Sequence, residues 1–236
     1  MLAALRDAQA LPLSYGVRVY EAPGGATLVV LGEAHLKLAR AERVGNAVVE
    51  AFALRGVETV QIARIAGGRA LYLAIHVPRQ LLRLLTFGLV RGSTITHAKA
   101  LREGRTVEIE RGQPIPLGLH VGSVYLSAFF AVFWLQLFLV ALGDASYGLA
   151  PLLLFFEVHM LAIVPAVLLR RHRWSWILHP AVAILTLRDT LMARGAVRML
   201  AEHPDAPTAV VVVGRAHVNG LERELVGEQG FRRVEL

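Results

Sequence analysis

The chain has 236 residues, with 25 Lys and Arg against 18 Asp and Glu, a formal net charge of +7. Apolar residues make up 55% and charged residues 18%, a balance that excludes an intrinsically disordered chain. The absence of cysteine excludes disulfides, thiolate nucleophiles, zinc fingers and iron–sulfur clusters. Arg6 and Asp7 interrupt the first apolar residues, so no signal peptide is expected.

The first half of the chain alternates apolar strands with helices. A short aliphatic run ended by glycine predicts a buried strand at 26–32, and apolar residues at helical spacing predict a helix over 38–54, ended by Arg55 and Gly56. Strands are then expected at 57–63 and 106–110, with a helix at 95–103. Between them, segment 78–92 mixes arginines with leucines and begins at Pro78. It predicts a helix that either lies on a membrane surface or faces the core of the soluble domain.

Two long apolar runs follow. Residues 112–169 contain no Lys or Arg and only two acids, Asp144 and Glu157. The uncharged run 118–142 would extend roughly 37 Å as a helix, against a hydrocarbon core of roughly 30 Å. After a polar turn at 143–148, a second run covers 149–169. We therefore expect a two-helix transmembrane hairpin.

The arginines around this hairpin predict its orientation, because positive residues stay on the cytoplasmic side. Trp174 and Trp176 suit the headgroup layer, and the shorter apolar stretch 177–187 is interpreted as interfacial or buried against the soluble domain. A cell-membrane protein with two spans and both termini in the cytoplasm is predicted. Three arginines precede the first span and three follow the second, whereas the turn has none: Arg102, Arg105, Arg111, Arg170, Arg171 and Arg173.

Glu157 leaves two interpretations open. A carboxyl group at mid-bilayer costs a few kcal/mol unless it is protonated, hydrated or partnered. Glu157 and His159 either form an intramembrane polar site, which a small transport subunit would need, or belong to a tilted helix whose carboxyl contacts Gln136 or water. The second interpretation is favoured because no other acid shares the segment.

The chain returns to a strand–helix pattern after the hairpin. Helices are predicted at 188–203 and 218–227, and strands at 209–214 and 231–236. Strands that alternate with helices favour a parallel sheet. The predicted fold class is α/β, a parallel-sheet soluble domain interrupted by the two-helix transmembrane hairpin. Its parts are 1–112, the first part of the α/β domain, 113–173, the hairpin, and 174–236, the second part.

Two strand ends share a pattern. Each aliphatic strand closes with Gly-x-Ala-His, at Gly32 to His35 and at Gly214 to His217, and an aliphatic residue follows. The carboxyl end of a strand is where open α/β sheets place ligand sites. Two neutral imidazoles there could bind a metal or share acid–base work, and Glu33 falls on the same side as His35. The alternative for each histidine alone is a capping or core role.

These corners resemble the TraB/PrgY family and the wider superfamily with ChaN, erythromycin-esterase-like and Tiki proteins. The first corner is similar to the Gly-Glu-x-His form of ChaN and the esterases. Residues 214–236 look like the TraB closing motif, Gly-x-x-His-Val-x-Gly-[Leu/Ile] before a helix and a strand. LRDTLMA, at 187–193, resembles the superfamily's Arg-[Asp/Asn] followed by Met-Ala. The resemblance covers about 20–65 and 187–236.

The resemblance implies a hydrolase-like, peptidase-like site that contains His35 and His217, with Glu33 as a ligand or general base. Arg188 and Asp189 would orient or bind an anionic substrate group, and Arg188 would stabilise an oxyanion. Tiki-like members imply a divalent metal ion (Mn, Co or Zn) on His35, His217 and Glu33. Esterase-like members imply histidine acid–base chemistry without a metal.

A non-catalytic alternative stays open, in which the same corners bind a metal, haem or a peptide and the protein regulates. Many relatives end the second strand in Val-Glu-Leu, where this chain has Gln61, and the missing acid favours this alternative. The expected partners are the lipid bilayer and a peptide or small-molecule substrate. Nucleic acid is not expected, because the arginines lie near the membrane edge without an aromatic–basic platform. The oligomeric state is left open.

Overall fold

The computed structural model describes residues 1–34, 37–59, 64–87, 90–91, 93–143, 145–169 and 175–235. The chain divides into two compact units, which are described separately. The sheet unit contains Met1–Val60, Gln80–Gln113 and Asp189–Leu236. The apolar-helix unit contains Gln61–Arg79 and Pro114–Arg188.

The sheet unit is built on six strands in the order β6-β4-β7-β2-β1-β8. β2, β7, β4 and β6 are parallel, whereas β1 is antiparallel to both of its neighbours. The α/β class is therefore confirmed, but the sheet is mixed where a parallel sheet was predicted, because β1 and its two pairings are antiparallel. The strands are β1 (Tyr15–Glu21), β2 (Thr27–Glu33), β4 (Leu54–Val57), β6 (Arg105–Glu108), β7 (Thr208–Gly214) and β8 (Arg232–Val234), and a separate antiparallel pair joins β3 (Lys37–Leu38) to β5 (Val90–Arg91).

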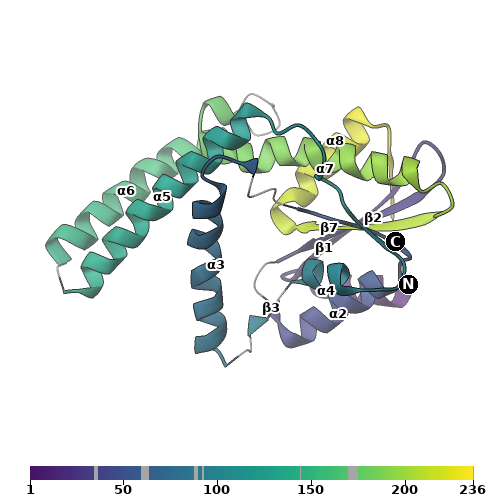
Figure 1. The fold of residues 1–236 in the computed structure, drawn as a ribbon, viewed down its shortest axis with the longest axis horizontal. Helices are drawn as coiled ribbons and strands as arrows, with labels where there is room; N and C mark the ends of the chain where they lie inside the picture. The colour runs from purple at the N-terminus through teal and green to yellow at the C-terminus, as the bar shows by residue number, and fades with distance from the viewer. Residues whose placement is uncertain are drawn as a thin grey trace. The chain divides into compact units, whose positions relative to one another are not determined.

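Helices cover both faces of the sheet. Along β2, Val29 and Leu31 face one layer while Leu28 and Val30 face the other, as the two-residue period of a strand requires. Fully burying such a side chain contributes about 2 kcal/mol. Figure 1 shows the two layers on either side of the strands. The first contains α1 (Leu2–Gln9), α2 (Ala39–Glu50) and α4 (Thr94–Ala100), and the second α7 (Ala183–Glu202) and α8 (Val218–Glu228).

The predicted second strand lies at different residues. A strand was expected at 57–63, but β4 covers Leu54–Val57 and residues 60–63 lie outside the described part. Arg55 was expected to end a helix, yet it lies inside β4. Its guanidinium is satisfied there, with Nε 2.7 Å from the Val49 carbonyl and Nη1 2.6 Å from the Glu103 carbonyl. The hydrogen bonds allow a buried arginine in a strand.

The apolar-helix unit contains α5 (Leu117–Ala141) and α6 (Ala145–Leu168). The rings of Phe129 and Phe155 stack between them, with centroids 4.9 Å apart. Both helices are long and apolar enough to cross a membrane, and an 18-residue window within each of Leu117–Ala141 and Leu149–Leu168 has mean hydropathy 2.1.

The short stretch after these helices packs against α5. It forms two 3₁₀ turns, η2 (Ser175–Ile177) and η3 (Pro180–Val182), before α7 begins. A Cβ on Gly122 of α5 would lie 2.5 Å from the Pro180 carbonyl oxygen, so only glycine allows this approach. Segment 177–187, expected to be interfacial or buried against the soluble domain, thus packs in part on an apolar helix.

Segment 78–92 departs from its prediction in length. The helix there, α3 (Gly68–Leu85), begins ten residues before Pro78, which lies inside it. Among its described residues only Gly68 and Leu71 are buried, while Leu84 and Leu85 are exposed. The alternative of a core-facing helix is therefore wrong.

Glu157 lies near the middle of α6 with an exposed side chain. Among the described residues Gln136 Oε1 has no hydrogen-bond partner, so a contact with Glu157 is not found there, and the two interpretations of Glu157 stay predictions. His159 instead packs against aromatic rings, with centroids 5.9 Å from Tyr125 and 6.3 Å from His179.

Candidate functional site

The two Gly-x-Ala-His corners follow neighbouring parallel strands. In the pairing of β2 with β7, Glu33 lies opposite Gly214, so both strands end at the same edge of the sheet. Gly32 permits this arrangement. A Cβ at Gly32 would lie 2.1 Å from Cγ2 of Val218, the residue that begins α8 after the second corner. The second corner therefore packs directly over the first strand.

The second corner holds a buried histidine–aspartate pair. The 3₁₀ turn η4 (Arg215–His217) leads from β7 into α8 and turns His217 toward α7. His217 Nδ1 lies 2.7 Å from Asp189 Oδ1, and the two residues are only 5% and 4% exposed. The carboxylate accepts the Nδ1 proton, which leaves the lone pair of the neutral ring on Nε2.

Gly220 makes room for this pair. A Cβ at that position would lie 1.6 Å from Asp189 Oδ2. The glycine of the His-Val-Asn-Gly sequence in the second corner is thus required by the carboxylate that orients His217, and not by a turn.

In the first corner, the acid Glu33 bonds to the start of a helix and not to a histidine of the second corner. Glu33 is fully buried, and its Oε1 accepts a hydrogen bond from Ser93 Oγ at 2.5 Å while Oε2 accepts one from the Thr94 amide at 2.7 Å. A carboxylate at the start of a helix satisfies otherwise unpaired amides. Tyr15 packs in the same layer, and its hydroxyl donates a hydrogen bond to the Ala41 carbonyl at 2.8 Å. Burial raises the pKa of Tyr15 to about 12.

The structure separates Glu33 from His217. Glu33 points to the layer of α2 and α4, whereas His217 points to α7 on the opposite face. His35 lies outside the described residues. A metal centre shared by Glu33 and His217 does not fit this arrangement, and the described residues contain no group of three metal-ligating side chains. A metal on His35 and His217 stays a prediction.

Two arginines near the corners, the predicted Arg188 and also Arg215, have different settings. Arg188 is 6% exposed and precedes Asp189 in α7. Successive helix residues point about 100° apart, so the two side chains leave the helix in different directions. The predicted role of Arg188 in stabilising an oxyanion stays a prediction. Arg215 is exposed and donates from Nη1 to the Leu13 carbonyl at 2.8 Å.

Glu58 was missed as a site residue. Because β4 ends at Val57, Glu58 is the acid at the end of the second strand, and its Oε2 accepts a hydrogen bond from the Gly214 amide at 2.7 Å. The inference from Gln61 that this acid is missing was wrong. The signal was the Val57–Glu58 pair, which was overlooked because the strand was predicted three residues too late in the sequence.

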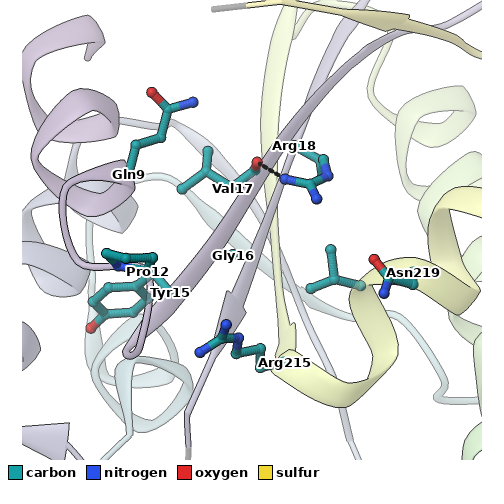
Figure 2. Close-up of a pocket in the computed structure, with 9 residues that line it drawn as sticks. Gln9, Pro12, Tyr15, Gly16, Val17, Arg18, Arg215 and Asn219 are labelled. Carbon is teal, nitrogen blue, oxygen red and sulfur yellow. Dashed lines mark hydrogen bonds between the residues drawn. The ribbon is translucent and has the colours of Figure 1, made fainter.

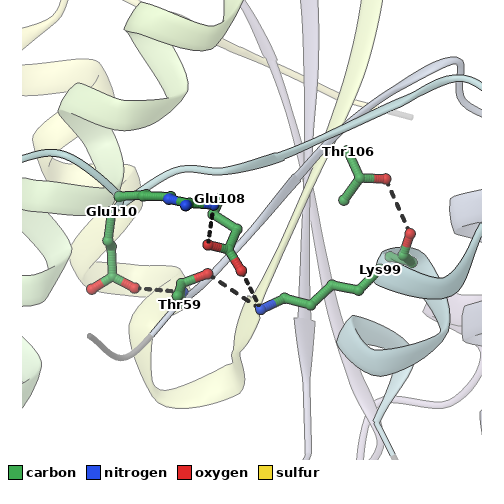
Figure 3. Close-up of polar contacts among 7 residues, drawn as sticks. Thr59, Lys99, Thr106, Glu108 and Glu110 are labelled. Atoms are coloured by element: carbon green, nitrogen blue, oxygen red, sulfur yellow. Dashed lines mark hydrogen bonds and ion pairs between the residues drawn. The ribbon is translucent and has the colours of Figure 1, made fainter. Parts of the chain in front are cut away.

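A further polar network lies beyond Glu58 at the same edge (Figure 3). Glu110 Oε2 accepts from the Thr59 amide at 2.8 Å, and Lys99 Nζ donates to Glu108 Oε1 at 2.8 Å. The bond from Lys99 lowers the pKa of Glu108. These contacts hold the ends of β4 and β6 together.

The chemical capacity of the site thus centres on His217. A carboxylate that fixes one ring nitrogen of a histidine prepares the other to accept a proton. No family model, no curated protein and no solved structure matches the chain.

Proposed function

We propose that the protein is a membrane-anchored hydrolase-like enzyme in which His217 is the general base and Asp189 positions it. The observation that carries the proposal is the buried 2.7 Å contact between the two at the carboxyl ends of parallel strands. Ligand sites of open α/β sheets occur at this edge. The resemblance of the corners to the TraB superfamily suggests peptides as substrates.

The reaction would proceed by activation of water. His217 Nε2 takes a proton from water as the water oxygen attacks the substrate carbonyl carbon, and Asp189 stabilises the resulting imidazolium. The imidazolium then gives this proton to the leaving amine as the carbon–nitrogen bond breaks. An amide and water thus yield an acid and an amine.

Membrane attachment is proposed for α5 and α6. Their length and apolarity, together with arginines beyond both ends and none in the connecting turn, support two spans with both termini on the cytoplasmic side. The exposed leucines and arginines of α3 suit a helix that lies on the same membrane surface.

The test is hydrolysis of a panel of peptides and esters by the full chain in detergent. His217→Gln and Asp189→Asn are each expected to lower turnover roughly 100-fold or more, since general-base catalysis contributes about that much. Turnover that survives His217→Gln would contradict the proposal. Metal content, measured in the wild type, His35→Ala and His217→Ala, decides between a metal-dependent and a histidine-only enzyme.

One observation favours the non-catalytic alternative, a regulator that binds a metal, haem or a peptide. The carboxylate of Glu33 is engaged by α4, so the first corner does not present this acid beside His217. Stoichiometric binding without turnover across the whole panel would support that function instead.

A further inference from the structure

A cavity of about 480 Å³ lies beside the start of β1 (Figure 2). Four consecutive residues of that strand, Tyr15 to Arg18, line it, together with Gln9, Arg215 and Asn219. Consecutive side chains of a strand point to opposite faces of the sheet. Four in a row can line one cavity only if the cavity lies along the edge of the strand.

No partner strand covers this part of the edge, although the Tyr15 amide there donates to the Leu11 carbonyl at 2.9 Å. β2 pairs with β1 along its whole length on the inner side, but β8 pairs only with Val19, Tyr20 and Glu21 on the outer side. Among the described residues, no strand residue pairs with the outer edge of Tyr15 to Arg18. The Val17 carbonyl accepts a bond from Arg18 Nη1 at 3.1 Å, so this carbonyl is turned away from β2. An extended peptide can lie along such an edge.

The cavity carries positive charge. Its lining includes two arginines, Arg18 and Arg215, and no acid. Arg215 has no carboxylate partner among the described residues. Arg18 Nε is 3.5 Å from Glu222 Oε2, but Glu222 also accepts a 3.0 Å bond from Arg233, so one carboxylate serves two guanidinium groups. Guanidinium groups bind carboxylates through paired, charge-assisted hydrogen bonds.

We infer that this cavity binds a peptide in extended form along β1 and that Arg18 and Arg215 hold a carboxylate of the peptide. Gln9 and Asn219 offer amide groups that can donate to and accept from peptide bonds. Arg215 belongs to the turn that ends in His217, so the bound peptide lies next to the second corner. Hydrolysis of the bound peptide rests on the proposed function, whereas its binding in the cavity does not.

The experiment is fluorescence anisotropy with the full chain in detergent. The probe is a labelled threonine–valine peptide with a free carboxyl terminus, compared with the same peptide as its amide. Binding of the acid is expected to be roughly tenfold tighter than binding of the amide, because one charge-assisted pair is lost. The double variant Arg18→Gln/Arg215→Gln should remove this difference. Arg194→Gln, which changes an exposed arginine of α7 outside the cavity, should preserve it.

Two results would overturn the inference. One is equal affinity of the wild type for the acid and the amide. The other is displacement of the peptide by inorganic phosphate at equal concentration, which would assign the arginines to a phosphate ligand. The proposed function fails separately: carboxylate-dependent binding that persists in His217→Gln, with no turnover in the wild type, would retain the peptide site and reject the hydrolase.

Discussion

The corner after β2 and the corner after β7 lie side by side on paired parallel strands, and both follow the sequence pattern Gly-x-Ala-His. Glu33 of the first corner is held by Ser93 and Thr94 on the α4 face. His217 of the second is held by Asp189 on the α7 face. A repeated pattern at a sheet edge thus has two roles, one joining a helix to the sheet and one orienting an imidazole. What each corner does depends on the helix that packs against it.

Replacing Glu33 should have the largest effect on stability. Glu33→Ala removes a buried carboxylate and leaves the Ser93 hydroxyl and the Thr94 amide without it, which costs about 3 kcal/mol. Urea denaturation in detergent measures the free energy of unfolding. The exposed acid Asp205, changed to alanine, should cost less than about 0.5 kcal/mol. A loss below about 1 kcal/mol in Glu33→Ala would show that the first corner does not anchor α4.

Gly220 offers the equivalent test of the second corner. Gly220→Ala places a methyl group against the Asp189 carboxylate and should destabilise the protein by about 2 kcal/mol while displacing the His217 ring. Gly227 lies in the same helix, and a Cβ there would meet nothing within 4 Å. Gly227→Ala should therefore stabilise by about 0.5 kcal/mol through helix propensity. Thermal unfolding compares the two variants, and equal shifts would refute the packing argument.

Tyr15 connects the first corner to α2. Tyr15→Phe removes the hydroxyl that donates to the Ala41 carbonyl and should cost about 1 kcal/mol. Because burial raises the pKa of Tyr15 to about 12, its contribution is complete below pH 10, where the unfolded tyrosine is neutral, and is lost as the pH rises toward 12. Denaturation of both proteins at pH 8 and pH 11 should show the difference shrinking. A constant difference would contradict a buried neutral hydroxyl.

The smallest effect is expected away from both corners, at Glu108. The bond from Lys99 lowers the pKa of this carboxyl, so the stability it contributes is present above the unfolded pKa of about 4.3 and is lost as the pH falls through the folded pKa. The pair is partly exposed, so Glu108→Gln should cost less than about 1 kcal/mol at pH 7. A difference that persists at pH 2 would point to packing and not to charge.

Local patterns predicted the elements that surround the corners, because β2 and β7 are uninterrupted aliphatic runs ended by glycine. They did not predict β1, although Tyr15, Val17 and Val19 alternate with less buried residues as a half-buried strand does. Nor could they predict what Glu33 contacts, because Ser93 lies 60 residues away and only the tertiary fold brings the two together. Asp189 was expected in the site, and in the structure its carboxylate is hydrogen-bonded to His217.

The division of roles between the corners is tested most directly by turnover in Asp189→Asn and Glu33→Gln, each corrected for the fraction of folded protein. Asp189→Asn is expected to lower the hydrolysis rate roughly 100-fold, whereas Glu33→Gln should retain the wild-type rate in its folded molecules. An unchanged rate in Asp189→Asn, or equal losses in the two variants, would contradict the division of roles between the corners.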